Sequence, residues 1–404
     1  MNRFIYIIVL IFLVLFVEGF PQEVRYDIDS FFSTPRQYSL GNTYLISYRE
    51  GVSFLKNPAV VSLGSNSRFY LIKLTAMAGA NTGYIYDALN LSSYNLNPFN
   101  PLQWIGFDWS SLTNELLKDP YGLLLNASPE VALFGPLALG YVGNGIGIMV
   151  YNDFFSSLNI RQAPGVPYVD LKAFAEIGLT FSFGTYFDIA KFSTLHIGAS
   201  LSYSKRYKSP FFYGGSVFEV VKFYENTQNG IYEYDVGDSV WGNIGVIFED
   251  NSMNLKYALV IENFFGRAFY WNRIIYSNEN EIIKEVNSYV SYIPPKFSFG
   301  ISYNLDRIPY IPVFLLSEFS IQFNLINMFY FDEFWFKKVH LGSEIALLKI
   351  FKLRGGISQG YPTFGIGINF DYLTIDIAFY QYERGVLPGY QGSQNILGSI
   401  EIKF

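Results

Sequence analysis

Side chains able to do acid–base, nucleophilic or metal chemistry are scarce in this chain of 404 residues, which has two histidines and no cysteine. His196 and His340 have Ser200, Ser202 and Ser343 near them in the sequence. Their spacing matches no arrangement of nucleophile, base and orienting group. Two histidines without cysteines also leave little material for a metal site. We therefore expect no enzyme, no catalytic residue, no metal ion and no cofactor.

Polar and ionisable side chains recur instead at alternate positions of strand-length segments. Segments such as 175–184, 195–203 and 296–305 place apolar residues on one face and small, polar or charged residues on the other. Because side chains of a strand alternate between faces, each segment predicts a strand with one apolar face. Counting segments between turn residues gives about fourteen strands. They are predicted to start near residues 68, 131, 145, 171, 193, 239, 253, 296, 314, 336, 351, 363, 372 and 395.

Composition favours a lipid-facing barrel over the alternative, a soluble β-sandwich. Half of the residues are hydrophobic and only 15% are charged, with 40 Phe and 33 Tyr. Soluble domains carry about 25% charged residues, so a sandwich would lack charge on its outer faces. Aromatic residues in such numbers suit lipid-facing strands and interfacial girdles. A net charge of −6 without a basic run argues against a nucleic-acid partner.

Turn chemistry predicts how the strands connect. Residues 213–237 and 269–287 are expected to be polar hairpins outside the strand count, and residues 82–129 to include a short helix. Since long connections of a barrel are extracellular, the short turns at 349–351 and 371–372 are predicted to be periplasmic. Hairpin turns are expected at Gly143-Asn144-Gly145, Asn229-Gly230 and Asn251-Ser252.

The last segment, 396–404, predicts how the ring closes. Ile400, Ile402 and Phe404 lie on one face of an extended strand. A chain that ends on such a strand with a terminal aromatic residue resembles an outer-membrane β-barrel. We expect this strand to pair with the one near Arg68. Its three apolar residues should face lipid and supply the signal for the outer-membrane barrel assembly machinery.

The N-terminus predicts export. Residues 1–20 have the features of a signal peptide, in which Asn2 and Arg3 precede an apolar run at 4–17. The run is shorter than a membrane span of about 20 residues, although an uncleaved anchor helix is the alternative. No second apolar stretch approaches a helical span, so a barrel must provide membrane residence. The predicted location is the bacterial outer membrane.

Residues 21–67 differ from the rest by polar composition and weak periodicity, and 68–404 would form the barrel. We interpret 21–67 as an N-terminal plug of turns and short helical pieces, with a surface linker as the alternative. The open lumen of a fourteen-stranded barrel must be filled, because otherwise it leaks. Asn57-Pro58 would make a rigid corner, and Gly41 would permit a tight turn or close contact with the wall. The predicted fold class is all-β: a transmembrane antiparallel β-barrel of about 14 strands with an N-terminal plug.

Several of these residues carry a family resemblance. Arg36, the run Leu40-Gly41-Asn42-Thr43-Tyr44 and then Asn57-Pro58-Ala59 resemble the start of FadL-type long-chain fatty-acid transporters and their PorV-like relatives. Residues 135–147 and 353–389 are similar to the PorV-like branch. The resemblance implies a plugged fourteen-stranded barrel that carries hydrophobic ligands through a binding groove and a sideways opening in its wall. It also implies that Arg36, Gly41, Asn57, Pro58 and Ala59 lie near the plug–ligand contact.

The alternation predicts which charges face the lumen. With a three-residue turn at 349–351, Glu344 and Arg354 would be diagonal neighbours on the inner face. Such a pair would hold the plug, satisfy itself or take part in transport. The predicted lumen-facing residues are Glu176, His196, Lys256, Glu262, Glu344, Arg354, Asp376, Glu401 and Lys403.

Together these features predict passive uptake of a hydrophobic small molecule, such as a long-chain fatty acid, along a groove between plug and wall. One alternative is a PorV-like barrel for protein secretion or surface attachment, with a secreted-protein partner. A structural barrel without transport is another. Outer-membrane lipids are expected partners in every case.

Overall fold

The computed structural model describes residues 25–26, 34–46, 52–63, 67–81, 130–135, 138–161, 168–212, 214–276, 282–305, 316–328, 334–348, 350–370, 372–383 and 392–404. The predicted signal peptide and the short helix expected within 82–129 lie outside these ranges. The elements are β1 (Arg25–Tyr26), α2 (Pro35–Ser39), η1 (Ser53–Leu55), η2 (Pro58–Ser62), β2 (Arg68–Asn81), β3 (Glu130–Phe134), β4 (Leu139–Gly143), β5 (Ile146–Arg161), β6 (Tyr168–Ala190), β7 (Ser193–Lys208), β8 (Gly215–Ser216), α7 (Val217–Gln228), β9 (Tyr232–Asp250), β10 (Leu255–Glu262), β11 (Arg267–Tyr276), β12 (Ile282–Ile293), β13 (Lys296–Leu305), β14 (Leu316–Leu325), η4 (Trp335–Lys338), β15 (Val339–Leu347), β16 (Phe351–Ser358), β17 (Tyr361–Asn369), β18 (Leu373–Glu383) and β19 (Gly392–Lys403). None of the helices in these ranges is both long and apolar enough to cross a membrane.

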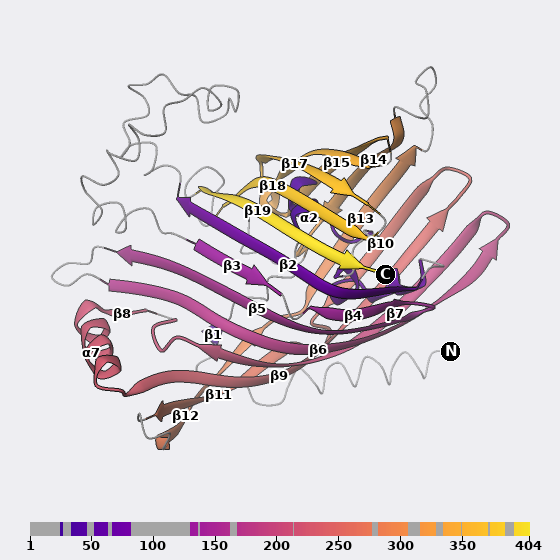
Figure 1. Ribbon diagram of the computed structural model, residues 1–404. Coiled ribbons are helices and arrows are strands. Elements are labelled where there is room, and N and C mark those ends of the chain that lie inside the picture. The colour runs from indigo at the N-terminus through magenta and orange to yellow at the C-terminus, as the bar shows by residue number, and fades with distance from the viewer. Residues whose placement is uncertain are drawn as a thin grey trace, which may run out of the picture.

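The wall strands form one closed antiparallel β-barrel, and the two-residue β1 adds to it in parallel with β12 (Figure 1). β3 and β4 are two parts of one wall strand, because both pair with β2 and with β5. β10 and β11 form another interrupted strand, and β12 and β13 a third. The wall therefore has 14 strands, as predicted. Each predicted start corresponds to one wall strand. β9 and the β12–β13 strand begin earlier in the chain than predicted.

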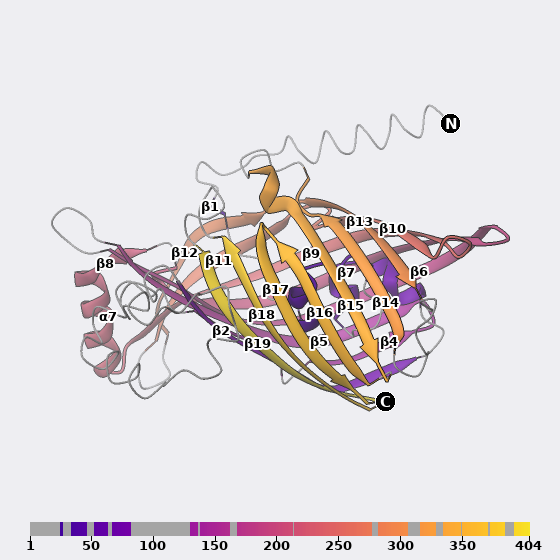
Figure 2. The same ribbon diagram turned by 90° about the horizontal axis from the view of Figure 1, so that it is seen from above.

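The predicted closing contact is confirmed. β19 pairs with β2 along nearly its whole length (Figure 2). Ile400 and Phe404 are exposed on the outer face and Ile402 is partly exposed, while Glu401 and Lys403 between them are buried. The strand therefore has the expected orientation, with its apolar side chains facing outward.

The connections differ between the two ends of the barrel. At one end the connections are tight, and they follow Gly143, Ala190, Asp250, Leu347 and Asn369, where β4, β6, β9, β15 and β17 end. Asn144 and Gly145 adopt φ angles of 53° and 79°, which suit a two-residue hairpin turn. The other end carries α7. The predicted hairpins at 143–145 and 251–252 are therefore confirmed, and the expected periplasmic turns lie at one common end.

The hairpin predicted for residues 213–237 is wrong, because α7 occupies the middle of that segment and β9 its end. The Ser216 backbone N–H and hydroxyl donate to Glu219 Oε2 at 2.7 Å and 2.9 Å, and the Glu219 N–H donates to Ser216 Oγ at 3.3 Å. This capping box starts the helix, and its hydrogen bonds lower the pKa of the Glu219 carboxyl. Asn229-Gly230 ends the helix and does not turn a hairpin. Residues 269–287 do lie in a hairpin, but one made by β11 and β12 of the wall.

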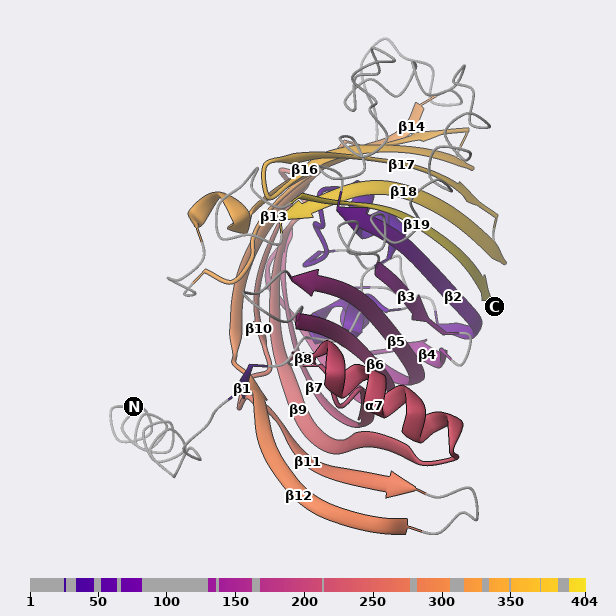
Figure 3. The same ribbon diagram turned by 90° about the vertical axis from the view of Figure 1, so that its left-hand side faces the viewer.

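Two stretches, 34–46 and 52–63, lie inside the ring and are called the inner segment below (Figure 3). α2 contacts β16, β17 and β18, whereas η2 contacts β6, β7 and β9 on the opposite side of the barrel. The inner segment occupies the place that the sequence predicts for a plug. Its helices have five residues or fewer, so turns make up much of it.

Candidate functional site in the lumen

The Asn57-Pro58-Ala59 turn is stabilised by its own side chains. Asn57 Oδ1 accepts a hydrogen bond from the Ala59 N–H at 3.1 Å, and Asn57 Nδ2 donates to the Leu45 carbonyl oxygen at 2.5 Å. Pro58 starts η2, where no backbone N–H is needed. The Asn57 amide therefore links the two parts of the inner segment.

Wall glycines let this turn approach the sheet closely. Gly184, Gly198 and Gly245 are paired across β6, β7 and β9. A Cβ added to Gly198 would lie 2.5 Å from backbone atoms of Pro58 and Ala59. Only glycine permits a contact of this kind. We call the three glycines with Pro58 and Ala59 the η2 seat.

On the opposite side, the chain leaves α2 through Gly41, whose φ is 68°. The Gly41 N–H donates to Thr363 Oγ1 at 3.0 Å, and the Thr363 hydroxyl donates to the Ser39 carbonyl oxygen at 3.0 Å. A Cβ added to Gly356 would lie 2.5 Å from the Gly41 nitrogen. The contact with the wall that the sequence suggests for Gly41 is present.

Arg36 extends from α2 to charged residues of the wall. Its Nε and Nη2 donate to the two carboxylate oxygens of Glu344 at 2.8 Å and 3.1 Å. Arg354 Nε donates to Glu344 Oε2 at 2.7 Å, and Arg354 Nη1 donates to Asp376 at 2.5 Å. All four residues are buried. We call them the arginine cluster. In this cluster the Glu344 carboxylate binds two guanidinium groups, that of Arg354 from the wall and that of Arg36 from the inner segment.

The register of Glu344 and Arg354 corrects the predicted one. The two residues are directly opposite each other, not diagonal, and Leu347 pairs with Phe351. The turn between β15 and β16 starts one residue earlier than predicted, because Leu348 adopts a φ of 53°. Leucine rarely occupies that region, so its residue type gives no signal of the turn.

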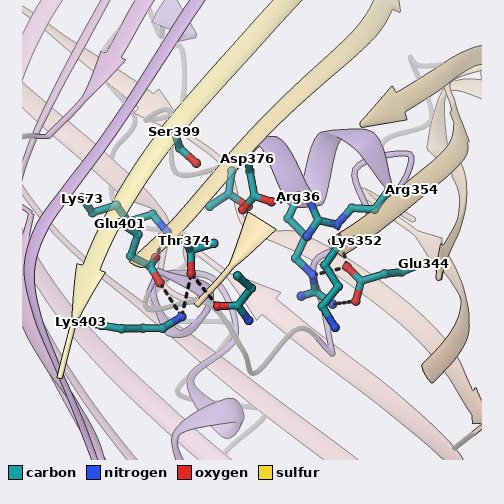
Figure 4. A pocket seen from close by; sticks show the side chains of 12 residues that line it. Arg36, Lys73, Glu344, Lys352, Arg354, Thr374, Asp376, Ser399, Glu401 and Lys403 are labelled. Carbon is teal, nitrogen blue, oxygen red and sulfur yellow. Dashed lines mark hydrogen bonds and ion pairs between the residues drawn. The ribbon is translucent and has the colours of Figure 1, made fainter. Parts of the chain in front are cut away.

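A cavity of about 40 Å³ lies between the arginine cluster and a second charged group (Figure 4). Lys73 Nζ lies 2.6 Å from Glu401 Oε2, and Lys403 Nζ lies 3.3 Å from Glu401 Oε1. We call Lys73, Glu401 and Lys403 the lysine cluster. The cavity has room for about three water molecules. Its lining consists of Thr34, Arg36, Lys73, Glu344, Lys352, Arg354, Asn369, Thr374, Asp376, Ser399, Glu401 and Lys403.

Apolar side chains fill the lumen on the η2 side. We call this group the lumen cluster; all of its members are buried, and it joins the inner segment to β3, β5, β9 and β10. A water-filled pore would have polar residues here. The members are Tyr44, Leu45, Ile46, Val52, Phe54, Leu55, Ala59, Val60 and Val61 of the inner segment, with Phe134, Ala138, Met149, Tyr151, Trp241, Ile247, Ala258, Val260 and Ile326.

Aromatic rings and guanidinium groups alternate further along the lumen. Arg206 Cζ lies 4.1 Å from the centre of the Phe174 ring and 4.6 Å from that of Phe269. Arg267 Cζ lies 4.7 Å from the Phe269 ring centre and 3.6 Å from that of Trp241. Rings flank each guanidinium group, an arrangement that stabilises buried cations. Aromatic side chains therefore continue beyond the lumen cluster, interleaved with buried charges.

The residues predicted to face the lumen do so: each is buried, or nearly so for Lys256, inside the barrel. Glu176 contacts Arg206 Nη2 at 2.6 Å and Arg267 Nη2 at 2.7 Å. Alternation identified the carboxylate, but its arginine partners come from other strands. In the described ranges, no group of three or more His, Cys, Asp or Glu side chains is placed to hold a metal ion.

Both histidines contact the inner segment. His340 Nδ1 lies 2.7 Å from a backbone oxygen, and His196 Nδ1 lies 3.0 Å from Ser62 Oγ, with His196 Nε2 3.5 Å from Glu249. The Ser62 hydroxyl donates to the Ala59 carbonyl oxygen at 2.9 Å. Ser62 therefore links the His196 ring to the backbone of the η2 turn. No sequence pattern indicates Ser62, because this residue meets His196 only through the fold.

The five residues expected near a ligand separate into two groups. Arg36 lines the charged cavity, while Gly41, Asn57, Pro58 and Ala59 pack against the wall or the inner segment and are not part of its lining. The cavity is charged, whereas the expected groove is apolar. Apolar surface in the lumen is provided by the lumen cluster, which includes Ala59.

No family model matches the chain, and no curated protein matches its sequence. Similar solved structures include the Pseudomonas putida toluene transporter TodX, with 10% identity, 94% of this chain and 99% of TodX covered, and a TM-score of 0.46. The Ralstonia pickettii toluene transporter TbuX has 11% identity, with 92% and 97% covered and a TM-score of 0.45. A Pseudomonas aeruginosa FadL homologue has 10% identity, with 94% and 99% covered and a TM-score of 0.44.

These structural neighbours are FadL-type outer-membrane proteins, the family that the sequence resembles. The PorV-like branch has no support from the comparisons. At such low identity the likeness concerns the fold alone, and a fold does not identify a ligand.

Proposed function

We propose that the protein is a bacterial outer-membrane channel for passive uptake of a hydrophobic small molecule. The observation that carries the proposal is the lumen cluster, which places buried apolar side chains where a porin has water. A polar solute would lose hydration there without compensation. An apolar passenger would instead gain about 0.8 kcal/mol for each CH₂ removed from water.

An entry surface for such a passenger lies on α7. Phe218, Val221 and Tyr224 recur every three residues, which places them on one side of the helix. Their exposed fractions are 72%, 48% and 63%. Neighbouring exposed apolar side chains of this kind are typical of interaction sites. We infer that this face collects the ligand at the end of the barrel that carries the long connections.

An exit lies at the interruption between β3 and β4. β3 ends at Phe134 and β4 starts at Leu139, and the Gly135 N–H donates to the Asn152 carbonyl oxygen at 2.9 Å. Phe134 and Ala138 on either side of the interruption belong to the lumen cluster. A weakened ladder next to the apolar interior supports release sideways into the membrane, which the resemblance to FadL-type proteins also implies.

In this proposal residues 21–67 act as the plug. Arg36, Gly41, Asn57, Pro58 and Ala59 hold it against the wall, so that the ligand passes along the lumen cluster. The signal peptide directs export, and the closing strand supplies the assembly signal. Long-chain fatty acids are the ligands that the resemblance suggests. No contact among the described residues favours the secreted-protein alternative.

The test is uptake by liposomes that contain the full chain and have lipopolysaccharide in the outer leaflet, because apolar solutes dissolve in a plain phospholipid bilayer and cross it without a channel. The labelled substrates are oleate and toluene, of which toluene is the cargo named for TodX and TbuX. We expect both to enter at least about tenfold faster than they enter empty liposomes, whereas the entry of arabinose should not be accelerated. Equal entry of arabinose would identify a water-filled pore. Apolar uptake no faster than into empty liposomes would contradict transport.

A matched pair of variants tests the path. Ala138→Phe adds a ring inside the lumen cluster, whereas Val131→Phe adds one to the outer face of the same wall strand. We expect the first to reduce uptake severalfold and the second to leave it unchanged. Heat-dependent electrophoretic mobility verifies that both barrels fold. Equal uptake by the two variants would contradict passage along the lumen cluster.

A further inference from the structure

We propose that the cavity between the arginine cluster and the lysine cluster binds one small oxyanion, with inorganic phosphate as its probe. This site is separate from the proposed path of the hydrophobic ligand, and it does not depend on transport. The cavity lies on the α2 side of the lumen and has no residue in common with the lumen cluster.

The charge of the lining favours an anion. Among the described residues, five basic and three acidic side chains line the cavity, namely the members of the two clusters and Lys352. Each of the eight is at most 8% exposed. Because the charges are buried, salt screens their field far less than it would at the surface. The field within the cavity therefore favours a negative group.

The three carboxylates leave basic groups on both sides of the space. Glu344 lies between two arginines and Glu401 between two lysines, so each shares its charge between two cations. Figure 4 shows the lysine cluster on one side of the pocket and the arginine cluster with Lys352 on the other. An oxyanion in the space would accept charge-assisted hydrogen bonds from more than one direction.

The size of the cavity limits the ligand. A volume of about 40 Å³ corresponds to about three water molecules. A phosphate or carboxylate group can replace those waters, but a hydrocarbon chain does not fit beside it. Lys403, Thr374 and Asn369 lie next to the short-turn end of their strands, so the anion would arrive from that end of the barrel.

The experiment is calorimetric titration of the full chain in nanodiscs with sodium phosphate, at constant ionic strength in chloride. We expect saturable binding to one site. Lys352→Met should weaken the affinity by about tenfold, because one charge-assisted hydrogen bond is lost. The control is Lys222→Met on the exposed face of α7, which should bind like the unmodified chain. Lys403→Gln is a second variant that should also weaken binding. It leaves the contact between Glu401 and Lys73 in place.

The outcomes are separable. Binding that is saturable and weakened by both cavity variants, but not by Lys222→Met, supports the site. Displacement of phosphate by acetate would also support it and would identify a carboxylate group as a source of the oxyanion. Absence of saturable binding, or equal affinity in Lys352→Met and Lys222→Met, would overturn the proposal and leave a cavity that holds water. Neither result changes the uptake measured in liposomes, so the two proposals fail independently.

Discussion

The η2 seat and the arginine cluster hold two ends of the same inner segment against opposite walls, and they do so by different chemistry. At the η2 seat, glycines bring backbone against backbone next to the apolar lumen cluster. At the arginine cluster, long charged side chains meet beside a cavity large enough for water. The first contact depends on shape, and the second on charge.

These two kinds of contact differ in how readily they can be replaced. A dry contact fixed by glycine has no substitute partner, because any added atom overlaps the backbone. The groups of an ion pair beside water can instead form replacement hydrogen bonds to water or to another ion when they separate. We therefore expect the α2 end of the inner segment to leave the wall before the η2 end. Because the chain has no cysteine, single cysteines at Ser39 and Ser53 can report the two ends separately by thiol labelling.

The largest effect is expected for Glu344→Ala. It leaves the guanidinium groups of Arg36 and Arg354 facing each other without the shared carboxylate, and losing one partner of a buried pair costs about 3–5 kcal/mol of unfolding free energy. Denaturant unfolding in lipid vesicles measures the loss. The reporter at Ser39 should label faster, while that at Ser53 stays protected.

The control for this variant is Glu233→Ala, which removes a partly exposed pair with Arg273 and should cost less than about 1 kcal/mol. Protection of the Ser39 reporter in Glu344→Ala would show that charge does not hold α2.

Gly198→Val should have the next largest effect and should reverse the labelling pattern. Its side chain would overlap Pro58 and Ala59, and overpacking costs about 1–3 kcal/mol. The Ser53 reporter should now label faster than the Ser39 reporter. Gly398→Val is the matched control, since a Cβ there has no heavy atom within 4 Å. Equal loss of stability in the two glycine variants would refute the close contact at the η2 seat.

Asn57→Ala should cost about 1–2 kcal/mol, because it removes the cap on Ala59 and the donor to Leu45. Asn57→Asp keeps an oxygen that can accept from the Ala59 N–H but loses the donor. Its stability, measured by the same unfolding experiment, should fall between those of the unmodified chain and Asn57→Ala. An aspartate variant as weak as the alanine variant would assign the effect to the Leu45 contact alone.

Thr363→Val should have the smallest effect, about 1 kcal/mol, since it preserves shape while removing the hydrogen bonds to Gly41 and Ser39. The unfolding midpoint measures it. A loss as large as that of Glu344→Ala would mean that hydrogen bonds to the backbone, and not the ion pairs, dominate the α2 end.

Much of the wall could be predicted from the sequence, because alternation and turn residues are local signals. The strand count, the closing pair β2–β19 and the inward direction of residues such as Glu344 follow from them. α7 was missed although Ser216 and Glu219 have capping-box spacing, because Asn229-Gly230 also suits a hairpin. The turn at Leu348 has no sequence signal, since leucine does not favour that conformation.

The contacts between the inner segment and the wall could not be predicted in the same way. Arg36 reaches Glu344, and Ser62 reaches His196, only after the ring brings distant parts of the chain together. Each partner has the right residue type, but many others in the chain share it. The resemblance to FadL-type proteins indicated Arg36 and Asn57 without indicating what they touch.

The pairing of β2 with β19 also sets an order of assembly. It joins Tyr70 near the start of the wall to Lys403 near the end of the chain, and pairing between such distant residues forms slowly. The inner segment precedes β2, so it must already lie within the curved sheet when β19 arrives; otherwise the closed ring would have to reopen. A chain truncated before β19 would therefore expose its apolar lumen to water, and exposed surface of this kind is prone to aggregation and is recognised by chaperones. The last strand thus determines when the interior becomes protected.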